Sequence, residues 1–438
     1  MVERVVVLAV LVAPLAAQSP APLRLTLEEA VRRAADSAPA VELATFRTDA
    51  ARARVRQARA GMLPTIGLGA EWLNRTFNRA SFGLDLPVPP GTPDLVGPFD
   101  IGDARVRFRQ PLLDWANAAR VRSARAQVTG TEAQSAVAGE AAAQTAALAY
   151  LRAARATALV AARRADSALA AELTSFAAAQ RDAGVATPLD VTRARTQLVV
   201  AREAIVLARS QVGRARVELA RALGLEAGTA IELAEGLSDS LGRAAVPAER
   251  EGAVALGLER RPDLAAEAAQ VRAAEQGARA VSAERLPRLE VAADYGVNGR
   301  TGPDAIATRQ VGVHVSIPIL DGFRREGRLS EQRALQGEAE VRRRELVRDI
   351  AAQVEVAFLE LESAQAQQAI AAERLRLAEE ELAQSRERFS AGVAGNIELI
   401  NAQVSLLDAR DAEIEARFAA AVARVALARA VGVARELK

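Results

Sequence analysis

The sequence contains one pattern twice, and this internal duplication constrains the fold more than any other feature. Prolines, a Pro-Leu-Leu-Asp or Pro-Ile-Leu-Asp segment, and an Ala-Gly-Val-Ala segment occur in the same order in both halves. The offset between the copies shortens once, which indicates a shorter loop in the second copy. An ordered duplication of this kind predicts two copies of one structural unit. The main correspondences are Pro39 with Pro262, Pro64 with Pro287, Pro111 with Pro318, and Gly184 with Gly392.

Each copy predicts three helices. Proline fits the first turn of a helix, so a short helix should begin at Pro39 and another at Pro262, each ending before the next proline of the pattern. A long helix follows in each copy, and a glycine turn then leads into a shorter helix. Apolar residues of the second long helix recur at spacings of three and four, which is typical of a coiled coil. The expected ranges are 119–182 and 330–390 for the long helices, and 188–223 and 397–431 for the shorter ones.

Two strands should precede each long helix. Apolar and polar side chains alternate there with a period of two, which predicts strands with one apolar face and one wet face. We assign Leu68, Val291, Val313 and Val315 to the apolar, lipid-facing side, and Arg107, Glu290 and His314 to the wet side.

Residues 1–17 have the features of a secretory signal peptide. Arg4 precedes an apolar run, and Ala17 stands before a polar segment, so the mature chain is expected to begin near Gln18. The sequence has no cysteine, which excludes disulfides, thiolate metal sites and a lipid anchor on cysteine. Its 57 basic and 55 acidic residues are interleaved, a pattern typical of solvated helix faces that argues against a nucleic-acid partner.

No cofactor and no metal site are predicted. His314 is the only histidine, and a lone histidine in a chain without cysteine does not make a metal site. No glycine-rich phosphate loop follows a strand, and no nucleophile or paired-carboxylate constellation supports catalysis. We therefore expect a protein that is not an enzyme.

Four strands cannot close a barrel alone, because bacterial single-chain barrels start at about 8 strands and open sheet edges are not tolerated in lipid. The strands must join those of neighbouring protomers, and the strand count alone allows 8 or 12. The expected fold class is an α+β membrane protein with long α-helical coiled-coil segments plus a transmembrane β-barrel to which each protomer contributes four strands; the resemblance described below implies that the helices form a tunnel. The expected domains are a signal peptide at 1–17, a first repeat at 18–224 with a hairpin at 64–113 and a turn at 183–187, a linker or side domain at 225–249, and a second repeat at 250–438 with a hairpin at 287–318 and a turn at 391–396.

The duplicated motifs resemble those of the TolC family of outer-membrane efflux proteins. The resemblance extends from Leu25 to about Gly432 and rests on the Leu-Pro pairs, the two Pro-x-Leu-Asp segments and the two Ala-Gly-Val turns. It implies a homotrimer in the outer membrane, in contact with its lipid, with a twelve-stranded barrel that continues into a helical tunnel in the periplasm. It also implies a periplasmic adaptor protein and an inner-membrane pump of the RND or ABC type as partners. The implied function is passive export, of small molecules or proteins, in a tripartite efflux or type I secretion system.

The resemblance also assigns residues to sites. In many family members the segment after the second turn reads Asp-Val-Leu-Asp-Ala and narrows the periplasmic entrance; here Glu398 retains the first acid and Asn401 replaces the second. The equivalent acid of the first copy is Asp190. The expected adaptor-contact tips are Gly184, Val185 and Ala186 with Gly392, Val393 and Ala394, and the expected lipid-interface aromatic residues are Trp72 and Tyr295.

Two alternatives remain open at this point. A periplasmic coiled-coil adaptor protein without a pore would also be rich in long helices, although it would not need two copies that each carry amphipathic strands. A secreted enzyme is a more distant alternative, because no catalytic site is recognisable.

Overall fold

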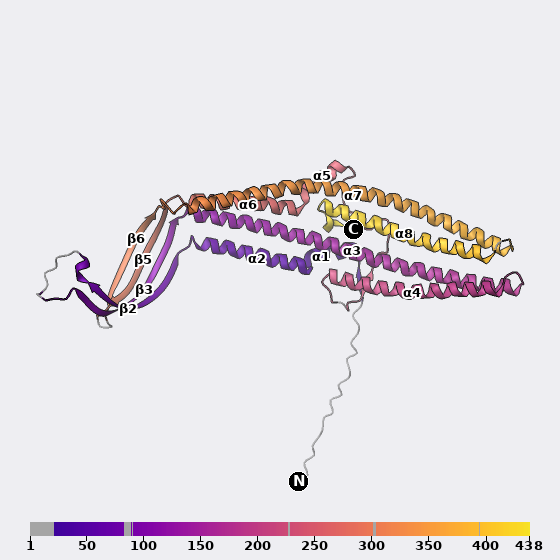
Figure 1. Ribbon diagram of the computed structural model, residues 1–438, viewed down its shortest axis with the longest axis horizontal. Helices are drawn as coiled ribbons and strands as arrows, with labels where there is room; N and C mark the ends of the chain where they lie inside the picture. The colour runs from indigo at the N-terminus through magenta and orange to yellow at the C-terminus, as the bar shows by residue number, and fades with distance from the viewer. Residues whose placement is uncertain (1–21, 83–88, 90, 227, 301–303, 394) are drawn as a thin grey trace, which may run out of the picture. The chain divides into compact units, whose positions relative to one another are not determined.

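The fold is described from a computed structural model, which covers residues 22–438 except 83–88, 90, 227, 301–303 and 394. The predicted signal peptide lies outside these residues. The helices are α1 (Leu27–Ser37), α2 (Pro39–Ala60), α3 (Trp115–Asp182), α4 (Pro188–Ala222), α5 (Arg250–Arg260), α6 (Pro262–Ala283), α7 (Arg324–Ser390) and α8 (Asn396–Ala430) (Figure 1). The strands are β1 (Leu23–Leu25), β2 (Thr65–Asn78), β3 (Leu95–Leu113), β4 (Ile231–Leu233), β5 (Arg288–Gly299) and β6 (Ile306–Ser316), and two short 3-10 helices are η1 (Arg79–Phe82) and η3 (Ala434–Glu436).

The chain forms two compact units, and each unit takes segments from both sequence copies. One unit contains the described residues up to Pro39 together with 139–250 and 355–438, and the other contains 40–138 and 251–354. The long helices α3 and α7 contribute to both. The predicted α+β class, with long coiled-coil helices and four strands in the larger sheet, is therefore confirmed.

The four-stranded sheet belongs to the unit formed by residues 40–138 and 251–354. Its strand order is β2-β3-β5-β6 and every neighbouring pair is antiparallel. The β3–β5 pair therefore joins the hairpin of the first copy to that of the second. The hairpin of the first copy is long, since β3 begins at Leu95, which pairs with Asn78 at the end of β2.

Polar contacts fix the helices of the same unit against one another. The Thr48 hydroxyl of α2 donates to the carbonyl oxygen of Thr131 in α3 at 3.2 Å, and the Ser123 hydroxyl of α3 donates to that of Ala273 in α6 at 2.9 Å. Helix α3 begins earlier than the predicted residue 119 because Asp114 accepts a hydrogen bond from the backbone N–H of Asn117 at 2.8 Å and caps the helix.

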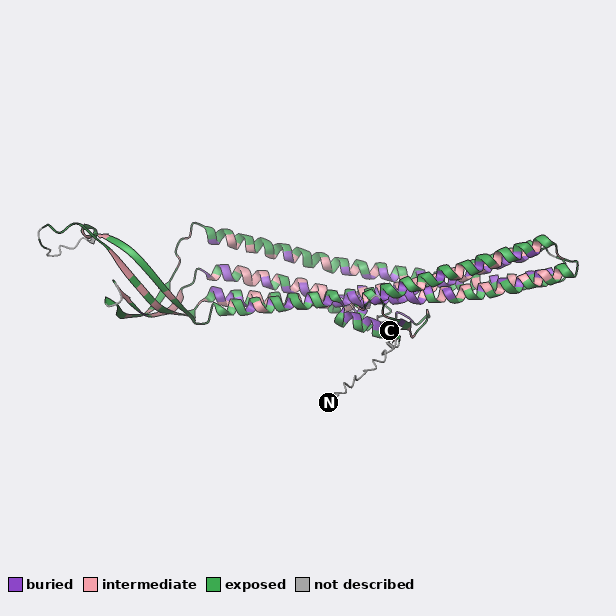
Figure 2. Ribbon diagram, turned by 90° about the horizontal axis from the view of Figure 1, so that it is seen from below, coloured by how far each residue is buried: buried purple, intermediate pink, exposed green. Residues whose placement is uncertain are grey.

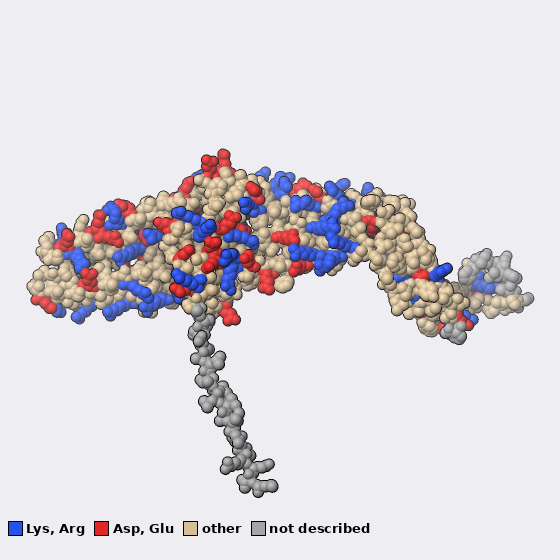
Figure 3. All heavy atoms as spheres, turned by 180° about the vertical axis from the view of Figure 1, so that it is seen from behind, with Lys and Arg blue, Asp and Glu red and all other residues tan. Residues whose placement is uncertain are grey.

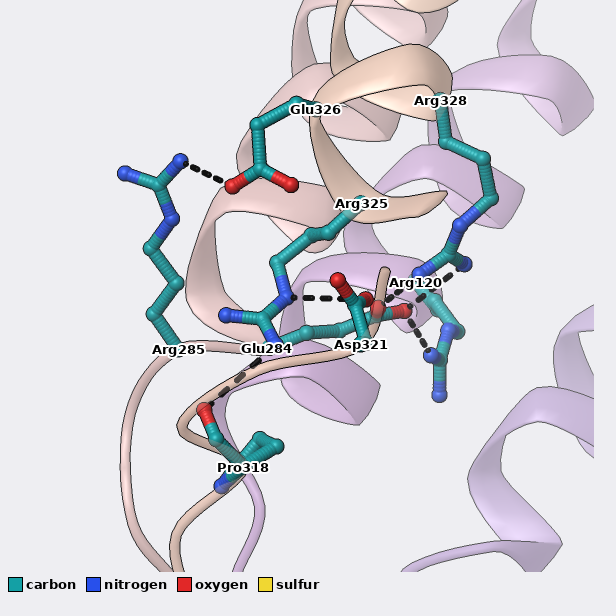
Figure 4. A network of polar contacts seen from close by, with 8 residues as sticks. All are labelled: Arg120, Glu284, Arg285, Pro318, Asp321, Arg325, Glu326 and Arg328. Carbon is teal, nitrogen blue, oxygen red and sulfur yellow. Dashed lines mark hydrogen bonds and ion pairs between the residues drawn. The ribbon is translucent and has the colours of Figure 1, made fainter. Parts of the chain in front are cut away.

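A cluster of charged residues lies where α3, α6 and α7 approach the sheet (Figure 4). The carboxylate of Glu284, which follows α6 and is 7% exposed, accepts hydrogen bonds from Arg120 of α3, at 2.6 Å, and from Arg328 of α7. Arg285 pairs with Glu326 beside it at 2.9 Å. This cluster connects the first long helix to the second.

The other unit is a set of coiled-coil helices. Ala177 of α3 packs against Val191 and Ala194 of α4, and Ala378 of α7 packs against Leu406 and Ala409 of α8. The buried residues form stripes along the helices, whereas the strands carry mostly exposed and intermediate residues (Figure 2).

Ion pairs join the two helical pairs of this unit. Asp166 of α3, whose side chain is 1% exposed, accepts from Arg410 of α8 at 2.7 Å, and Arg163 of α3 pairs with Asp411 of α8. These contacts join α3 to α4 and to α8, and α8 to α7. Near the turns α3 also contacts α7, through the Glu172–Arg386 ion pair and the Phe176–Phe389 ring contact.

Residues 225–249, predicted as a linker or side domain, contain β4, which pairs in parallel with β1. The hydroxyl of Tyr150, a fully buried residue of α3, lies 3.1 Å from the carbonyl oxygen of Leu25 and accepts from the N–H of Glu235 at 3.2 Å. Burial raises the pKa of Tyr150 to about 12, so this hydroxyl stays a neutral hydrogen-bonding group at any physiological pH. It ties the small sheet to α3.

Among the residues that the structure describes, no helix combines the length and the apolar character needed to cross a membrane.

Candidate functional site

The two glycine turns have the same backbone geometry. In the first, the N–H of Val185 donates to the carbonyl oxygen of Gln180 at 2.9 Å, and Gly184 adopts a φ of 77°. In the second, the N–H of Val393 donates to the carbonyl oxygen of Arg388 at 3.0 Å, and Gly392 adopts a φ of 67°. These are helix C-caps of the Schellman type, which need a residue with positive φ and therefore favour glycine.

The structure brings the two turns together. A β-carbon placed on Gly392 would lie 3.8 Å from Cγ1 of Val185, so the turns are in contact. Val185 and Val393 are exposed, at 56% and 69%. Ala186 is half-buried against the cluster formed by Leu173, Phe389 and Leu399, whereas Ala394 lies outside the described residues.

Asp190 caps its own helix. Its Oδ2 accepts from the backbone N–H of Thr187 at 2.9 Å and from the Thr187 hydroxyl at 2.7 Å, while its own N–H donates to Oγ1 of Thr187 at 3.3 Å. These hydrogen bonds hold the pKa of the Asp190 carboxyl below its ordinary value. The carboxylate predicted for the constriction is therefore already engaged at the start of α4 in a capping box.

Glu398 has a different environment at the equivalent position of α8. The helix begins at Gly395, which has no side chain to cap it, and Oε1 of Glu398 accepts from Nε of Arg388 at 2.8 Å. Asn401 lies one turn further on and is exposed. Residues three apart share a helix face, so Glu398 and Asn401 point to the same side of α8.

The starts of α4 and α8 are linked directly. The side chain of Asn396, which is 5% exposed, donates from Nδ2 to the backbone carbonyl oxygen of Asp190 at 3.1 Å. Sequence analysis did not identify Asn396 or Arg388. The repeat could have pointed to Asn396, because the two copies differ at this position. The first copy has Pro188 there, which has no side-chain or backbone N–H to donate.

The sheet separates apolar from charged side chains. Directly paired residues of neighbouring strands point to the same face. Leu68 pairs with Val106, Val106 with Tyr295, and Val291 with Val313, which places these side chains on one face. On the opposite face Gly67 pairs with Arg107, Arg107 with Asp294, and Glu290 with His314. The strand register thus places the residues assigned to the two faces as the sequence predicts.

The predicted interface aromatic residues lie on the apolar face of the sheet. Trp72 and Tyr295 are exposed there, within β2 and β5. Two further exposed aromatic residues lie close to the helix starts: Trp115 is the first residue of α3, one residue after its Pro-x-Leu-Asp segment, and Phe323 directly precedes α7, two residues after its segment. The duplication contained this signal, since both follow the Pro-x-Leu-Asp segments.

Trp72 and Trp115 are separated by a membrane-sized distance, whereas Tyr295 pairs with Val106 and lies between these two levels. Trp72 pairs with Gly102 of β3, and residues 103–114 lead from there to Trp115. Roughly 12 residues at ~3.3 Å each, in a strand tilted by about 45°, rise by about 25 to 30 Å, which matches the apolar band of outer-membrane barrels.

A comparison with protein-family profiles matches the outer membrane efflux protein family at residues 30–225 and 254–433. The chain belongs to the outer membrane efflux protein family. Membership identifies it as an efflux channel protein of the outer membrane with a periplasmic helical part, and it gives no support to the adaptor alternative. A comparison with curated proteins gives no match.

Solved structures share the fold of this efflux protein. A membrane protein from Pseudomonas aeruginosa is 21% identical with a TM-score of 0.78, and 93% of each chain is covered. The outer membrane protein VceC from Vibrio cholerae is 21% identical with a TM-score of 0.75, covering 93% of this chain and 96% of VceC. The MtrE outer membrane channel of Neisseria gonorrhoeae is 16% identical with a TM-score of 0.72, covering 94% of this chain and 90% of MtrE.

Proposed function

We propose that three copies of the chain assemble into the passive exit duct of a tripartite efflux or type I secretion system. The observation that supports this most directly is the sheet with one apolar and one charged face. Leu68 is 81% exposed and Val313 is 64% exposed on the apolar face, so a lone chain leaves both unburied. Strands β2 and β6 each have one edge without a partner strand among the described residues. Neighbouring copies would pair these edges, and lipid would cover the apolar face.

The helices support the same ring. Helix α4 packs on α3, and α7 packs on α8 and, near the turns, on α3. Both α4 and α7 carry exposed apolar residues, and those of α7 border the groove between α7 and α8. These are Val199, Val200, Val206 and Leu207 on α4, and Val356, Leu359, Ile370 and Leu377 on α7. Packing α4 of one copy against α7 of the next would bury both rows and close a ring by a head-to-tail contact.

Charge favours the same contact. Arg195, Arg202, Arg209 and Arg216 recur every seventh residue along α4, and their side chains make no hydrogen bond or ion pair with any residue that the structure describes. Glu373, Glu380 and Glu387 recur with the same period along α7, and Arg376 of the same helix pairs with the first two of them. A basic row facing an acidic row fixes partner and register in coiled-coil contacts.

Within this duct we assign the periplasmic constriction to Glu398 and Asn401, with Asp190 as a neighbouring structural acid. Three copies would bring the Glu398 side chains around one axis, where acidic rings select cations. Val185 and Val393, at the contacting turns, are the exposed apolar residues available to a periplasmic adaptor, which would connect the duct to an inner-membrane pump of the RND or ABC type. We expect no cofactor and no enzymatic activity.

Disulfide trapping tests the assembly, and the absence of native cysteine makes each engineered pair unambiguous. Val206 and Ile370 lie at nearly the same number of residues from their turns, so Val206→Cys/Ile370→Cys should form cross-linked dimers and trimers in outer-membrane extracts. The control pair Val206→Cys/Val347→Cys should not cross-link, because Val347 lies about 35 Å further along α7. A chain that stays monomeric and outside the outer-membrane fraction would exclude the duct.

A further inference from the structure

A cleft between α2 and α3 is lined by four arginine residues. It has a volume of about 430 Å³ and lies in the unit that contains the sheet. Its lining is Arg52, Val55, Arg56 and Arg59 of α2 with Arg125 and Val128 of α3. Val55 is buried and Val128 is half-buried, so guanidinium groups surround an apolar floor.

Most of this positive charge has no counter-charge. Arg52 pairs with Asp49 at 3.2 Å and with Glu132 at 2.8 Å. The side chains of Arg56, Arg59 and Arg125 make no hydrogen bond or ion pair with any residue that the structure describes. Neither 50–70 nor 115–131 contains an acidic residue. Guanidinium groups gathered without an anion repel one another, and a phosphate group would relieve this repulsion through paired N–H donors.

The cleft lies next to the strands. Helix α2 ends at Ala60 and β2 begins at Thr65, while β3 ends at Leu113 and α3 begins at Trp115. Arg59 is therefore within one turn of the helix end, and Arg125 lies about 15 Å from the start of α3. Figure 3 shows Lys and Arg side chains gathered on the helical part close to the sheet. A lipid head-group layer is about 5 to 8 Å thick, and arginine side chains can extend several ångströms to reach it.

The second copy lacks this cluster. Arg52 is replaced by Glu275 and Arg59 by Ser282 at the equivalent positions of the second copy. Only two arginine residues are retained there: Arg279 is equivalent to Arg56, and Arg333 is equivalent to Arg125. The arginine cluster is therefore not a by-product of the duplicated helix pattern. It is specific to the first copy, and the second copy offers a natural control at the same level of the fold.

We propose that this cleft binds the phosphate of an anionic phospholipid in the periplasmic leaflet of the outer membrane, with its acyl chains along the apolar face of the sheet. The proposal rests on the proposed function, because the sheet must lie in the membrane. The shared chemistry is a phosphate group, and lipid is favoured over free phosphate because the two helices that form the cleft lead directly to exposed apolar residues, Ile66 near the start of β2 and Trp115 after β3.

The test is native mass spectrometry of the delipidated, purified oligomer titrated with phosphatidylglycerol or with phosphatidylcholine. Arg56→Gln/Arg59→Gln/Arg125→Gln should bind phosphatidylglycerol at least about tenfold more weakly than wild type, because three attractive charges are lost. Binding of phosphatidylcholine, which carries no net charge, should change little. Arg279→Gln/Arg333→Gln, the control in the second copy, should retain wild-type affinity for both lipids.

Wild-type affinity for phosphatidylglycerol in the triple variant would overturn the inference. Full displacement of the lipid by millimolar inorganic phosphate would also overturn it, since the site would then recognise free phosphate. The oligomer is scored in the same spectra, so failure of the proposed assembly is seen separately. If the triple variant does not assemble, Arg125→Gln alone is compared with Arg333→Gln by the same criterion.

Discussion

Nε of Arg388 donates to Oε1 of Glu398 at 2.8 Å, joining the last turn of α7 to the first turn of α8 across the glycine turn. Both side chains remain about half exposed. A pair this exposed contributes little stability. The pair matters for electrostatics instead. The positive charge of Arg388 offsets part of the negative charge that Glu398 would present at a constriction.

This pair makes a directional prediction for ion selectivity. In planar bilayers Glu398→Gln should reduce the preference for cations and weaken block by divalent ions added on the periplasmic side. Arg388→Gln should do the opposite, because it frees the carboxylate. Asp190→Asn is the matched control and should change selectivity less. If Glu398→Gln and Arg388→Gln both have the ion selectivity of wild type, the constriction lies elsewhere.

The capping box at the start of α4 predicts a local effect on stability. Thr187→Ala removes the hydroxyl that bonds the backbone N–H of Asp190, and should cost about 1 kcal/mol of helix stability. Hydrogen exchange of residues 187–192 should quicken, while α8, which has no side-chain cap at Gly395, should be unaffected. Unchanged exchange would mean that the contact with Asn396, rather than the cap, fixes this turn.

The same box has a pH dependence with a defined sign. Because the pKa of Asp190 is lowered in the folded state, its contribution to stability is present above the ordinary carboxyl pKa. That contribution is lost as the pH falls below about 4 and through the lowered value. Exchange of α4's first turn should therefore quicken on acidification in wild type and respond less in Asp190→Asn.

The duplication predicted more of the fold than of the sites. The spacing of apolar residues and the internal duplication predict the strands, the long helices and the two faces of the sheet, because these features depend on local sequence pattern. These sequence patterns do not predict the pairing of β3 with β5, because that pairing depends on how two hairpins that are distant in sequence meet. The engagement of Asp190 by Thr187 was missed, although the spacing Thr187-x-x-Asp190 before a helix is the signature of a capping box and could have shown it.

The strand register can be tested by neighbouring substitutions. Val313 pairs with Val291 on the apolar face, and His314 pairs with Glu290 on the charged face. An arginine at the lipid-facing position should cost about 2 to 4 kcal/mol at the membrane midplane, whereas one on the pore side should be tolerated. Val313→Arg should therefore reduce the amount of heat-modifiable oligomer in the outer membrane much more than His314→Arg. Equal losses would contradict the assignment of faces.

The two contacting turns predict a separation of assembly from export. Val185→Glu and Val393→Glu place a charge on exposed apolar residues, of which Val185 also lies beside Gly392 of the second turn. Both should abolish export in cells while oligomer and membrane location stay at wild-type levels. Val185→Thr, which keeps the shape of the side chain, should export normally. Normal export by both charged variants would show that the turns do not contact an adaptor.

Glu284 predicts a difference between a buried and an exposed ion pair within one cluster (Figure 4). Burial alone would raise its pKa, but hydrogen bonds from Arg328 and Arg120 outweigh this and leave the pKa lowered. Glu284→Gln removes the charge that both guanidinium groups share and should lower the stability of the oligomer by roughly 1 to 3 kcal/mol, below the range for fully buried pairs because both arginine side chains are partly exposed. Glu326→Gln, the matched control, breaks the exposed pair with Arg285 and should cost less than about 1 kcal/mol.

The measurement is the urea concentration at which the oligomer dissociates on gel electrophoresis. Because the folded-state pKa is lowered, the difference between wild type and Glu284→Gln should be full at neutral pH and shrink as the pH falls below about 4. Equal midpoints for the two variants would show that the cluster is a solvated surface network and does not join α3 to α7.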